Sequence, residues 1–379
     1  MACPIIFIHQ GEGGPFYHLN LAILQARWWN PDADVFVIAD EACRTSLVVP
    51  GITVVNLEEY AESGAELRAV YQHFSPNPES FELFCMVRWF VLRDFMRRQH
   101  VDKVWHLDSD VMLYATVEEE ERHLQAADYT YTRASGHSSF FTQPAVDHLC
   151  ELMLGTYGAE DASRRLHDLW EKGKAEGYKA LSDMTFFLLM AREGRLRGVN
   201  REFPGADGAA HSVNVRGVSA YSLPKELMVL EFRNQRPHGR RLTDGGWDRF
   251  ATLHFQGAAK CFMKEYLRPP GDALPSWSVA CIAGLFAELE RGHPEATTRR
   301  ASMAHALSEA HQALKQLSKN HDRATQGFRT KAGKFLRKVE EIAELRTLRW
   351  AEKLRLSRAH RRLLAVVQSM KDWLETKER

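Results

Sequence analysis

The feature that most constrains this chain is a pair of aspartates, Asp108 and Asp110, set within an apolar run. Residues 104–107 read Val-Trp-His-Leu and residues 111–113 read Val-Met-Leu, which predicts a buried strand that delivers two carboxylates to its carboxyl end. Two carboxylates in apolar surroundings require a metal, a proton or a basic partner. Mg²⁺ or Mn²⁺ suits such oxygens, commonly together with phosphates of a ligand. A plain strand-end turn is the alternative, because Asp is common there.

Strand and helix signals alternate through the first half of the chain. Strands are predicted at residues 4–8, 35–38 and 52–55, and helices at 17–29 and 81–99. This alternation predicts an α/β fold with a mostly parallel, Rossmann-type sheet that is flanked by helices. In open sheets of this kind, ligands bind beyond the carboxyl ends of the strands.

The second half of the chain is expected to continue the domain. The pattern predicts further strands at residues 129–132, 138–142 and 252–255, and helices at 144–154, 161–177 and 182–192. Residues 203–218 and 234–246 are rich in Gly, Asp, Arg and Pro, and are predicted as loops.

Charge divides the chain into two parts. Residues 1–290 hold 29 Lys/Arg and 39 Asp/Glu, whereas residues 291–379 hold 21 and 10. The last part also contains no Pro after residue 297, and its apolar residues recur at alternating spacings of four and three. We therefore predict a domain at 1–285 and a basic α-helical C-terminal extension at 286–379. The extension is expected to act as a coiled-coil self-association arm, as a membrane-surface helix or as a solvated bundle.

The cellular setting is expected to be cytoplasmic. The six cysteines form no C-x-x-C pair, so zinc and redox motifs are not expected. The first residues lack the basic start of a signal peptide, and no run approaches the roughly 20 apolar residues of a membrane span. Peripheral contact of the tail with the inner membrane face is the alternative, and the acidic main domain argues against nucleic acid as a partner.

A second motif lies at residues 254–260, His-Phe-Gln-Gly-Ala-Ala-Lys. The imidazole of His254 can complete the coordination of a metal beside two carboxylates. Gly257 would let the backbone approach phosphates closely, and Lys260 would neutralise a diphosphate as a point charge. Taken alone, the segment also fits a core histidine followed by a turn and a surface lysine.

The two motifs together resemble the GT-A-fold nucleotide-sugar glycosyltransferases, and most closely the retaining enzymes of family 8. In that family both aspartates and the histidine bind Mn²⁺, while the glycine and the lysine meet the diphosphate. The resemblance therefore implies Mn²⁺ (or Mg²⁺) on Asp108, Asp110 and His254, with Gly257 and Lys260 at the diphosphate. Family 8 usually continues this motif with Pro-Trp, whereas this chain continues it with Cys-Phe.

Two further residues are candidates for the sugar end of the site. Arg88 lies on the helix before the Asp-x-Asp strand, and an arginine on an apolar helix face must pair with an anion. Similar enzymes place an arginine there against the nucleotide-sugar; the alternative is a surface residue. Asp183 opens the helix after its N-cap Ser182, and is expected to be the base of an inverting reaction or to hold the donor sugar of a retaining one. Helix capping is the plain alternative. Ser138 and Ser139 are weaker candidates for the sugar pocket.

At the nucleotide end, His9, Gln10 and Gly13 follow the first strand, and Asp40 ends the second. Carboxyl ends of strands at this edge normally hold base and ribose. Ser109, between the two aspartates, completes the set of candidate nucleotide-binding residues.

These observations predict a metal-dependent glycosyltransferase. The expected donor is a nucleoside-diphosphate sugar, with a UDP-sugar first, and the expected acceptor is a saccharide or glycoconjugate. The His-Gly-Lys motif favours retention. One alternative is a haloacid-dehalogenase-like phosphatase, whose nucleophile loop residues 108–111 also fit, although that loop normally lies near the N-terminus. The other is a non-enzymatic scaffold that acts through its basic helices.

Overall fold

The computed structural model describes most of the first unit of the chain. The described residues are 3–11, 17–123, 125–204, 208–217, 219–222, 227–271 and 278. The chain divides into two compact units, Met1–Leu289 and Glu290–Arg379. Gly13 and the whole predicted extension at 286–379, with its coiled-coil and membrane-surface roles, lie outside the described residues, so the predicted domain boundary stays a prediction. Within the described part, no helix is both long and apolar enough to span a bilayer.

A seven-stranded sheet forms the centre of the described unit. Its order is β3 (Thr53–Asn56), β2 (Val35–Ala39), β1 (Ile5–His9), β4 (Lys103–Leu107), β7 (Ser138–Thr142), β6 (Tyr129–Tyr131) and β8 (Gly198–Asn200). The first four strands are parallel, β7 runs antiparallel to both of its neighbours, and β6 and β8 are parallel. The predicted α/β fold with a mostly parallel sheet is confirmed.

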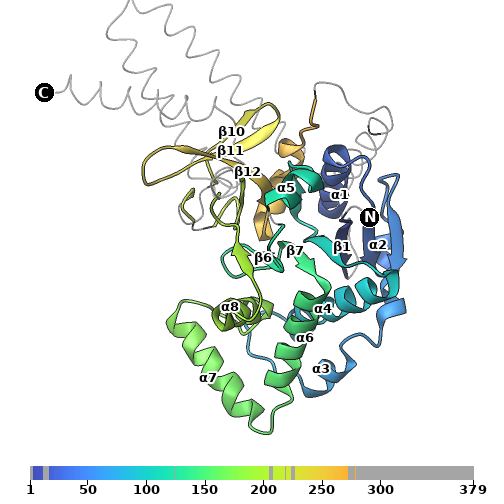
Figure 1. Ribbon diagram of the computed structural model, residues 1–379, viewed down its shortest axis with the longest axis vertical. Helices are drawn as coiled ribbons and strands as arrows, with labels where there is room; N and C mark the ends of the chain where they lie inside the picture. Colours follow the sequence, from blue (N-terminus) through green and yellow to red (C-terminus); the bar gives the residue numbers. More distant parts are fainter. Residues whose placement is uncertain are drawn as a thin grey trace, which may run out of the picture. The chain divides into compact units, whose positions relative to one another are not determined.

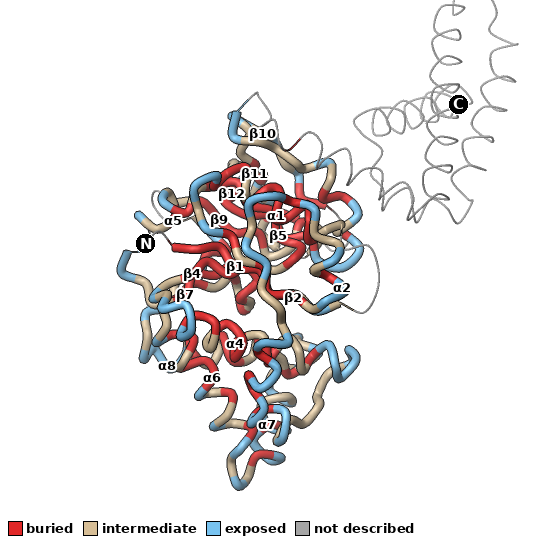
Figure 2. The backbone as a smooth tube through the Cα atoms, turned by 90° about the vertical axis from the view of Figure 1, so that its right-hand side faces the viewer, coloured by how far each residue is buried: buried red, intermediate tan, exposed pale blue. Residues whose placement is uncertain are grey.

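Helices cover both faces of this sheet because its central strands are apolar on both sides. Along β1, Ile5 and Phe7 face the core that contains α1 (Tyr17–Trp29), whereas Ile6 and Ile8 face the core that contains α4 (Glu79–Gln99). In Figure 1, α4, α6 (Gln143–Tyr157) and α8 (Asp183–Glu193) lie below the strands, and α1 and α5 (Val117–His123) lie above them. Figure 2 shows β1 and β4 as buried throughout their central residues.

Four further helices belong to the described unit, besides the 3₁₀ helix that begins at Gly257. They are α2 (Glu41–Arg44), η1 (Leu57–Tyr60), α3 (Ala65–Val70) and α7 (Ala162–Ala175). The helices predicted at 17–29, 81–99, 144–154, 161–177 and 182–192 are confirmed, with ends that differ by a few residues.

The prediction of a single strand across residues 104–113 is wrong, because these residues form two strands in two different sheets. The chain turns at Asp108–Asp110, where the N–H of Val111 donates to the carbonyl of Asp108 at 3.0 Å. After this turn, β5 (Val111–Leu113) leaves the large sheet and pairs antiparallel with β12 (Trp247–His254). The apolar run is continuous in sequence because both strands are buried, so it gave no sign of the change of sheet.

The loop predictions at 203–218 and 234–246 are wrong in part. They contain β9 (Ala210–His211) and β11 (Arg236–Arg240), both in the second sheet. The residues of β11, Arg-Pro-His-Gly-Arg, have little strand preference of their own. They are held extended because β10 (Leu230–Arg233) and β12 pair with them from either side.

Candidate active site

The pairing of β5 with β12 assembles the candidate metal site. His254, the last residue of β12, lies opposite Val111, and the N–H of Phe255 donates to the carbonyl of Asp110 at 2.9 Å. Ligand atoms of Asp108, Asp110 and His254 consequently all lie within 4.8 Å of one another. Two carboxylates and an imidazole form a donor set that suits Mn²⁺, so the residues present fit the metal that the sequence motifs imply.

The ring of His254 is fixed in the orientation that a metal ligand needs. Its Nδ1–H donates to the carbonyl of Val213 at 2.7 Å, which leaves Nε2 facing Asp110, 3.3 Å from Oδ1. Burial disfavours the protonated imidazole, but the carboxylates of Asp110 and Asp108 outweigh burial and raise the pKa of His254. A backbone carbonyl that fixes one ring nitrogen is the usual outer support of a metal-binding histidine.

Asp108 is held by two donors to its carboxylate and by one hydrogen bond from its own backbone N–H. Its Oδ1 lies 2.6 Å from Nη1 of Arg88 and 3.2 Å from Nε2 of His106, and its backbone N–H donates to the carbonyl of His137 at 2.8 Å. Burial alone would raise the pKa of Asp108, but Arg88 and His106 together hold it far below its ordinary value. The carboxylate is therefore kept ionised, as a metal ligand must be.

Asp110 is paired with the lysine of the second motif. Nζ of Lys260 lies 3.3 Å from Oδ2 of Asp110. Burial opposes ionisation of Asp110, but His254 and Lys260 keep its pKa below the ordinary value. Lys260 lies on η2 (Gly257–Tyr266) and is about one-third exposed, so its ammonium borders both the carboxylate and solvent.

Gly257 begins η2 with a backbone conformation that favours glycine. Its φ is +60°, in the left-handed region, and no atom lies within 4 Å of the position that a Cβ would occupy. The backbone is therefore open to a ligand at this point, as the predicted contact with phosphate requires.

Arg88 joins the metal site to the predicted sugar end. Its Nη2 lies 2.8 Å from Oδ2 of Asp183, the first residue of α8, while Nη1 binds Asp108. The indole N–H of Trp89 donates to the same oxygen of Asp183 at 3.1 Å. Arg88 thus pairs with two carboxylates of the protein, as expected for a cation on an apolar helix face, and its predicted contact with the nucleotide-sugar stays a prediction. The predicted role of Asp183 in catalysis or sugar binding stays a prediction, but its side chain is buried at the site.

The predicted nucleotide end lies at the same edge of the sheet. Asp40 accepts hydrogen bonds from the N–H groups of Gly11 at 2.8 Å and Cys43 at 3.0 Å, so it ties the loop after β1 to the start of α2. His9 ends β1, and burial followed by the charge of Lys260 lowers the pKa of His9 to about 4. Gln10 is exposed. Their contact with base or ribose stays a prediction.

The serine candidates are all buried. Ser109 is 8% exposed in the turn between the two aspartates. Ser138 accepts a hydrogen bond from the indole of Trp105 at 3.3 Å, and Ser139 is completely covered. The predicted roles of the three serines stay predictions.

Two residues of the site, His106 and His137, carry no motif. His106 interrupts the apolar run before Asp108. A polar residue within a predicted buried strand was the one sequence feature that could have marked it as a site residue. His137 precedes β7 in a turn, and nothing in its sequence neighbourhood marks it.

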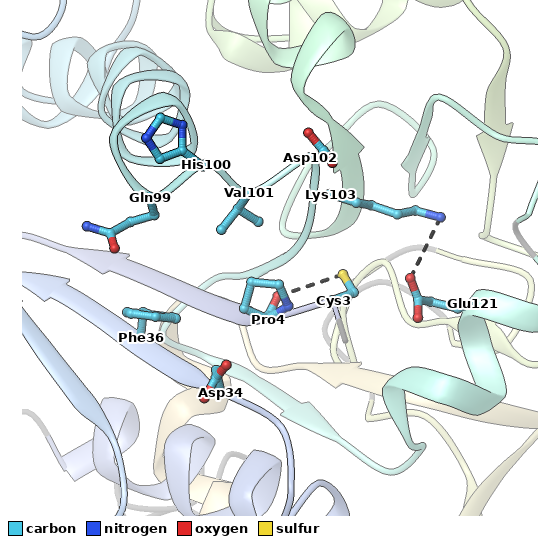
Figure 3. A pocket seen from close by; sticks show the side chains of 10 residues that line it. All are labelled: Cys3, Pro4, Asp34, Phe36, Gln99, His100, Val101, Asp102, Lys103 and Glu121. Carbon is cyan, nitrogen blue, oxygen red and sulfur yellow. Dashed lines mark hydrogen bonds and ion pairs between the residues drawn. The ribbon is translucent and has the colours of Figure 1, made fainter. Parts of the chain in front are cut away.

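A separate pocket of about 250 Å³ opens at the opposite edge of the large sheet. Figure 3 shows its lining at the amino ends of β1 and β4, with Lys103 reaching toward Glu121 at 3.9 Å. Burial raises the pKa of the Cys3 thiol at this pocket, which favours the protonated thiol. None of the predicted site residues lines it.

Comparisons with known proteins show a likeness to solved structures, but none to family models or curated sequences. No protein-family model matches the chain, and no curated protein sequence matches it. A crystal structure of mouse xyloside xylosyltransferase 1, in its apo form, is similar to 52% of this chain and 84% of its own, with 11% sequence identity and a TM-score of 0.38. Because the sequence identity is so low, the function must be inferred from the side chains of the site and not from this likeness.

Proposed function

We propose that this chain is a metal-dependent glycosyltransferase that takes a sugar from a nucleoside-diphosphate donor. The observation that carries the proposal is the meeting of Asp108, Asp110 and His254 at one edge of the sheet, with Lys260 beside Asp110. This donor set would hold Mn²⁺ or Mg²⁺. The bound metal would stabilise the charge that grows on the leaving diphosphate.

Charge balance at the site supports a diphosphate ligand. Asp108, Asp110 and Asp183 face the cations of Arg88 and Lys260, so one negative charge remains. A divalent ion would turn this balance to a net positive charge. The partly exposed ammonium of Lys260 could then move from Asp110 to the phosphates as a point charge.

Asp183 is placed to hold the donor sugar. Its Oδ2 accepts from both Arg88 and Trp89. Within the described residues its other oxygen, Oδ1, has no protein hydrogen-bond partner, which leaves it to accept from a sugar hydroxyl. We propose this holding role, together with a retaining reaction, a UDP-sugar as donor and a saccharide or glycoconjugate as acceptor.

Titration calorimetry with UDP, GDP and CDP, each with and without Mn²⁺, tests the proposal. Metal-dependent binding of one diphosphate is expected, with UDP tightest, and Asp110→Asn should abolish it. Asp147→Asn is the matched control, because Asp147 pairs with Arg97 at the surface, away from the site. Failure of every nucleotide to bind with Mn²⁺ would refute the proposal.

A second assay separates the transferase from the phosphatase alternative. The purified chain with Mn²⁺ should release UDP slowly from a UDP-sugar by transfer to water, and an added saccharide acceptor should accelerate that release. Release of phosphate from p-nitrophenyl phosphate, lost in Asp108→Asn, would favour the phosphatase instead.

A further inference from the structure

His137 touches both arms of the candidate metal site. It is 1% exposed and lies in the turn before β7. Its carbonyl accepts the N–H of Asp108 at 2.8 Å. Its ring stacks on that of His254, with centroids 4.1 Å apart and planes inclined by 20°. One residue thus contacts the backbone of one candidate ligand and the imidazole of another.

Two consecutive carbonyls orient this stacked pair. Nε2–H of His137 donates to the carbonyl of Ser212 at 3.0 Å, and Nδ1–H of His254 donates to the carbonyl of Val213 at 2.7 Å. The segment is anchored in turn, because the N–H of Ser212 donates to the carbonyl of Thr252 on β12 at 3.1 Å. The dipeptide therefore sets the hydrogen-bonded nitrogen of both rings.

The hydrogen bond from Nδ1 of His254 does not by itself fix the tilt of the ring, and the stack with His137 opposes that tilt. A ring held only through Nδ1 can still tilt about its bond to the carbonyl of Val213, and tilting carries Nε2 away from Asp110. A flat neighbouring ring opposes this tilt, because parallel planes at van der Waals separation cannot tilt independently. Supporting contacts of this kind fix the geometry of metal ligands.

We propose that His137 is a positioning residue of the metal centre, which holds the plane of His254 by ring stacking. This inference rests on the proposed metal site. His137 itself is not a ligand, since its ring nitrogens are not part of the cluster formed by Asp108, Asp110 and His254. Its effect is exerted through His254.

Two near-isosteric variants separate the stack from the hydrogen bond. His137→Phe keeps a flat ring and loses the donor to Ser212, whereas His137→Gln keeps an N–H donor and loses the ring. MnCl₂ titration by calorimetry should show affinity within about threefold of wild type for His137→Phe. For His137→Gln it should fall by about tenfold or more, the range for loss of an outer support of a metal ligand. His148→Gln, a buried histidine on α6 paired with Glu193, is the control and should not change the affinity.

Every result of these Mn²⁺ titrations either supports or overturns the proposed role of His137. Wild type that binds no Mn²⁺ would overturn the proposed metal site and the role of His137 with it. Wild type that binds, with His137→Gln equal to it or with both variants equally weakened, would overturn the role of His137 alone. If His137→Gln does not melt cooperatively, His137→Phe decides: a tenfold loss at an unchanged melting temperature overturns the inference, and affinity within threefold supports it.

Discussion

Arg88 and Asp183 form a buried ion pair in which Nη2 lies 2.8 Å from Oδ2, and the same guanidinium binds Asp108 at 2.6 Å. The two carboxylates are far apart in sequence, on the turn after β4 and at the start of α8. A planar fork suits this bridging, because each terminal nitrogen can serve one partner. Arg88 therefore keeps the metal end and the sugar end of the site in a fixed relation.

Replacing Arg88 should destabilise the protein, and added metal should reduce this loss. Arg88→Gln leaves two largely buried carboxylates without their cation, which is expected to lower the free energy of unfolding by about 3 kcal/mol. Mn²⁺ should restore part of this loss, since it would compensate Asp108. Urea unfolding with and without MnCl₂ measures both effects. Arg97→Gln, which breaks a surface pair with Asp147, should cost below about 1 kcal/mol. An equal loss in the two variants would contradict the bridging role.

Replacing Lys260 should separate binding of the metal from binding of the nucleotide. Lys260→Met removes a cation 3.3 Å from Asp110, so Mn²⁺ alone should bind as tightly as to wild type or a few-fold more tightly. Mn²⁺-dependent binding of UDP should weaken about tenfold, the equivalent of one charge-assisted hydrogen bond. Calorimetry measures both constants. Lys103→Met, at the opposite edge of the sheet, should change neither. Unaltered UDP affinity in Lys260→Met would remove the lysine from the diphosphate site.

Gly136 should tolerate no side chain. A Cβ there would lie 2.3 Å from Cζ of Phe187 and 2.6 Å from Cη2 of Trp89, and neither ring is free to move. Gly136→Ala is expected to lower the free energy of unfolding by about 1–3 kcal/mol through overpacking. It should also weaken activity, because Trp89 donates to Asp183. Gly155→Ala on α6 meets nothing within 4 Å and should stabilise by about 0.5–1 kcal/mol. Chemical denaturation of both variants tests the pair; a stable Gly136→Ala would be inconsistent with the packing.

His18 should make the protein sensitive to mild acid. Burial, followed by the charge of Lys260, lowers the pKa of His18 from 6.5 to about 3, and Nε2 has no hydrogen-bond partner in the described part of the chain. Between these values the unfolded chain binds one proton more than the folded protein, so stability falls as pH falls below about 6.5.

Removing this histidine should therefore flatten the acid side of the stability profile. From about pH 6.5 to pH 5, His18→Phe should lose about 1.5 kcal/mol less stability than wild type. Urea unfolding at the two pH values gives the comparison. A difference between the two proteins that does not change with pH would show that His18 does not titrate in this way.

Local sequence was enough for the framework of this protein. The alternation of strands and helices followed from side-chain periodicities, which depend on neighbours a few residues away. The cluster of Asp108, Asp110 and His254 was predictable because its members stand in two recognisable motifs. Arg88 was predictable because a cation on an apolar helix face needs an anion.

Only the tertiary structure shows which strands pair and which distant side chains contact each other. The apolar run around Asp108 looks the same whether it forms one strand or two, and only the pairing of β5 with β12 shows that it changes sheet. The strand β11 is weak in its own residues and is extended by its neighbours. The stack of His137 on His254 and the ion pair of Arg88 with Asp183 join distant segments. Such contacts depend on how whole elements pack in space, and short-range sequence patterns carry no record of that packing.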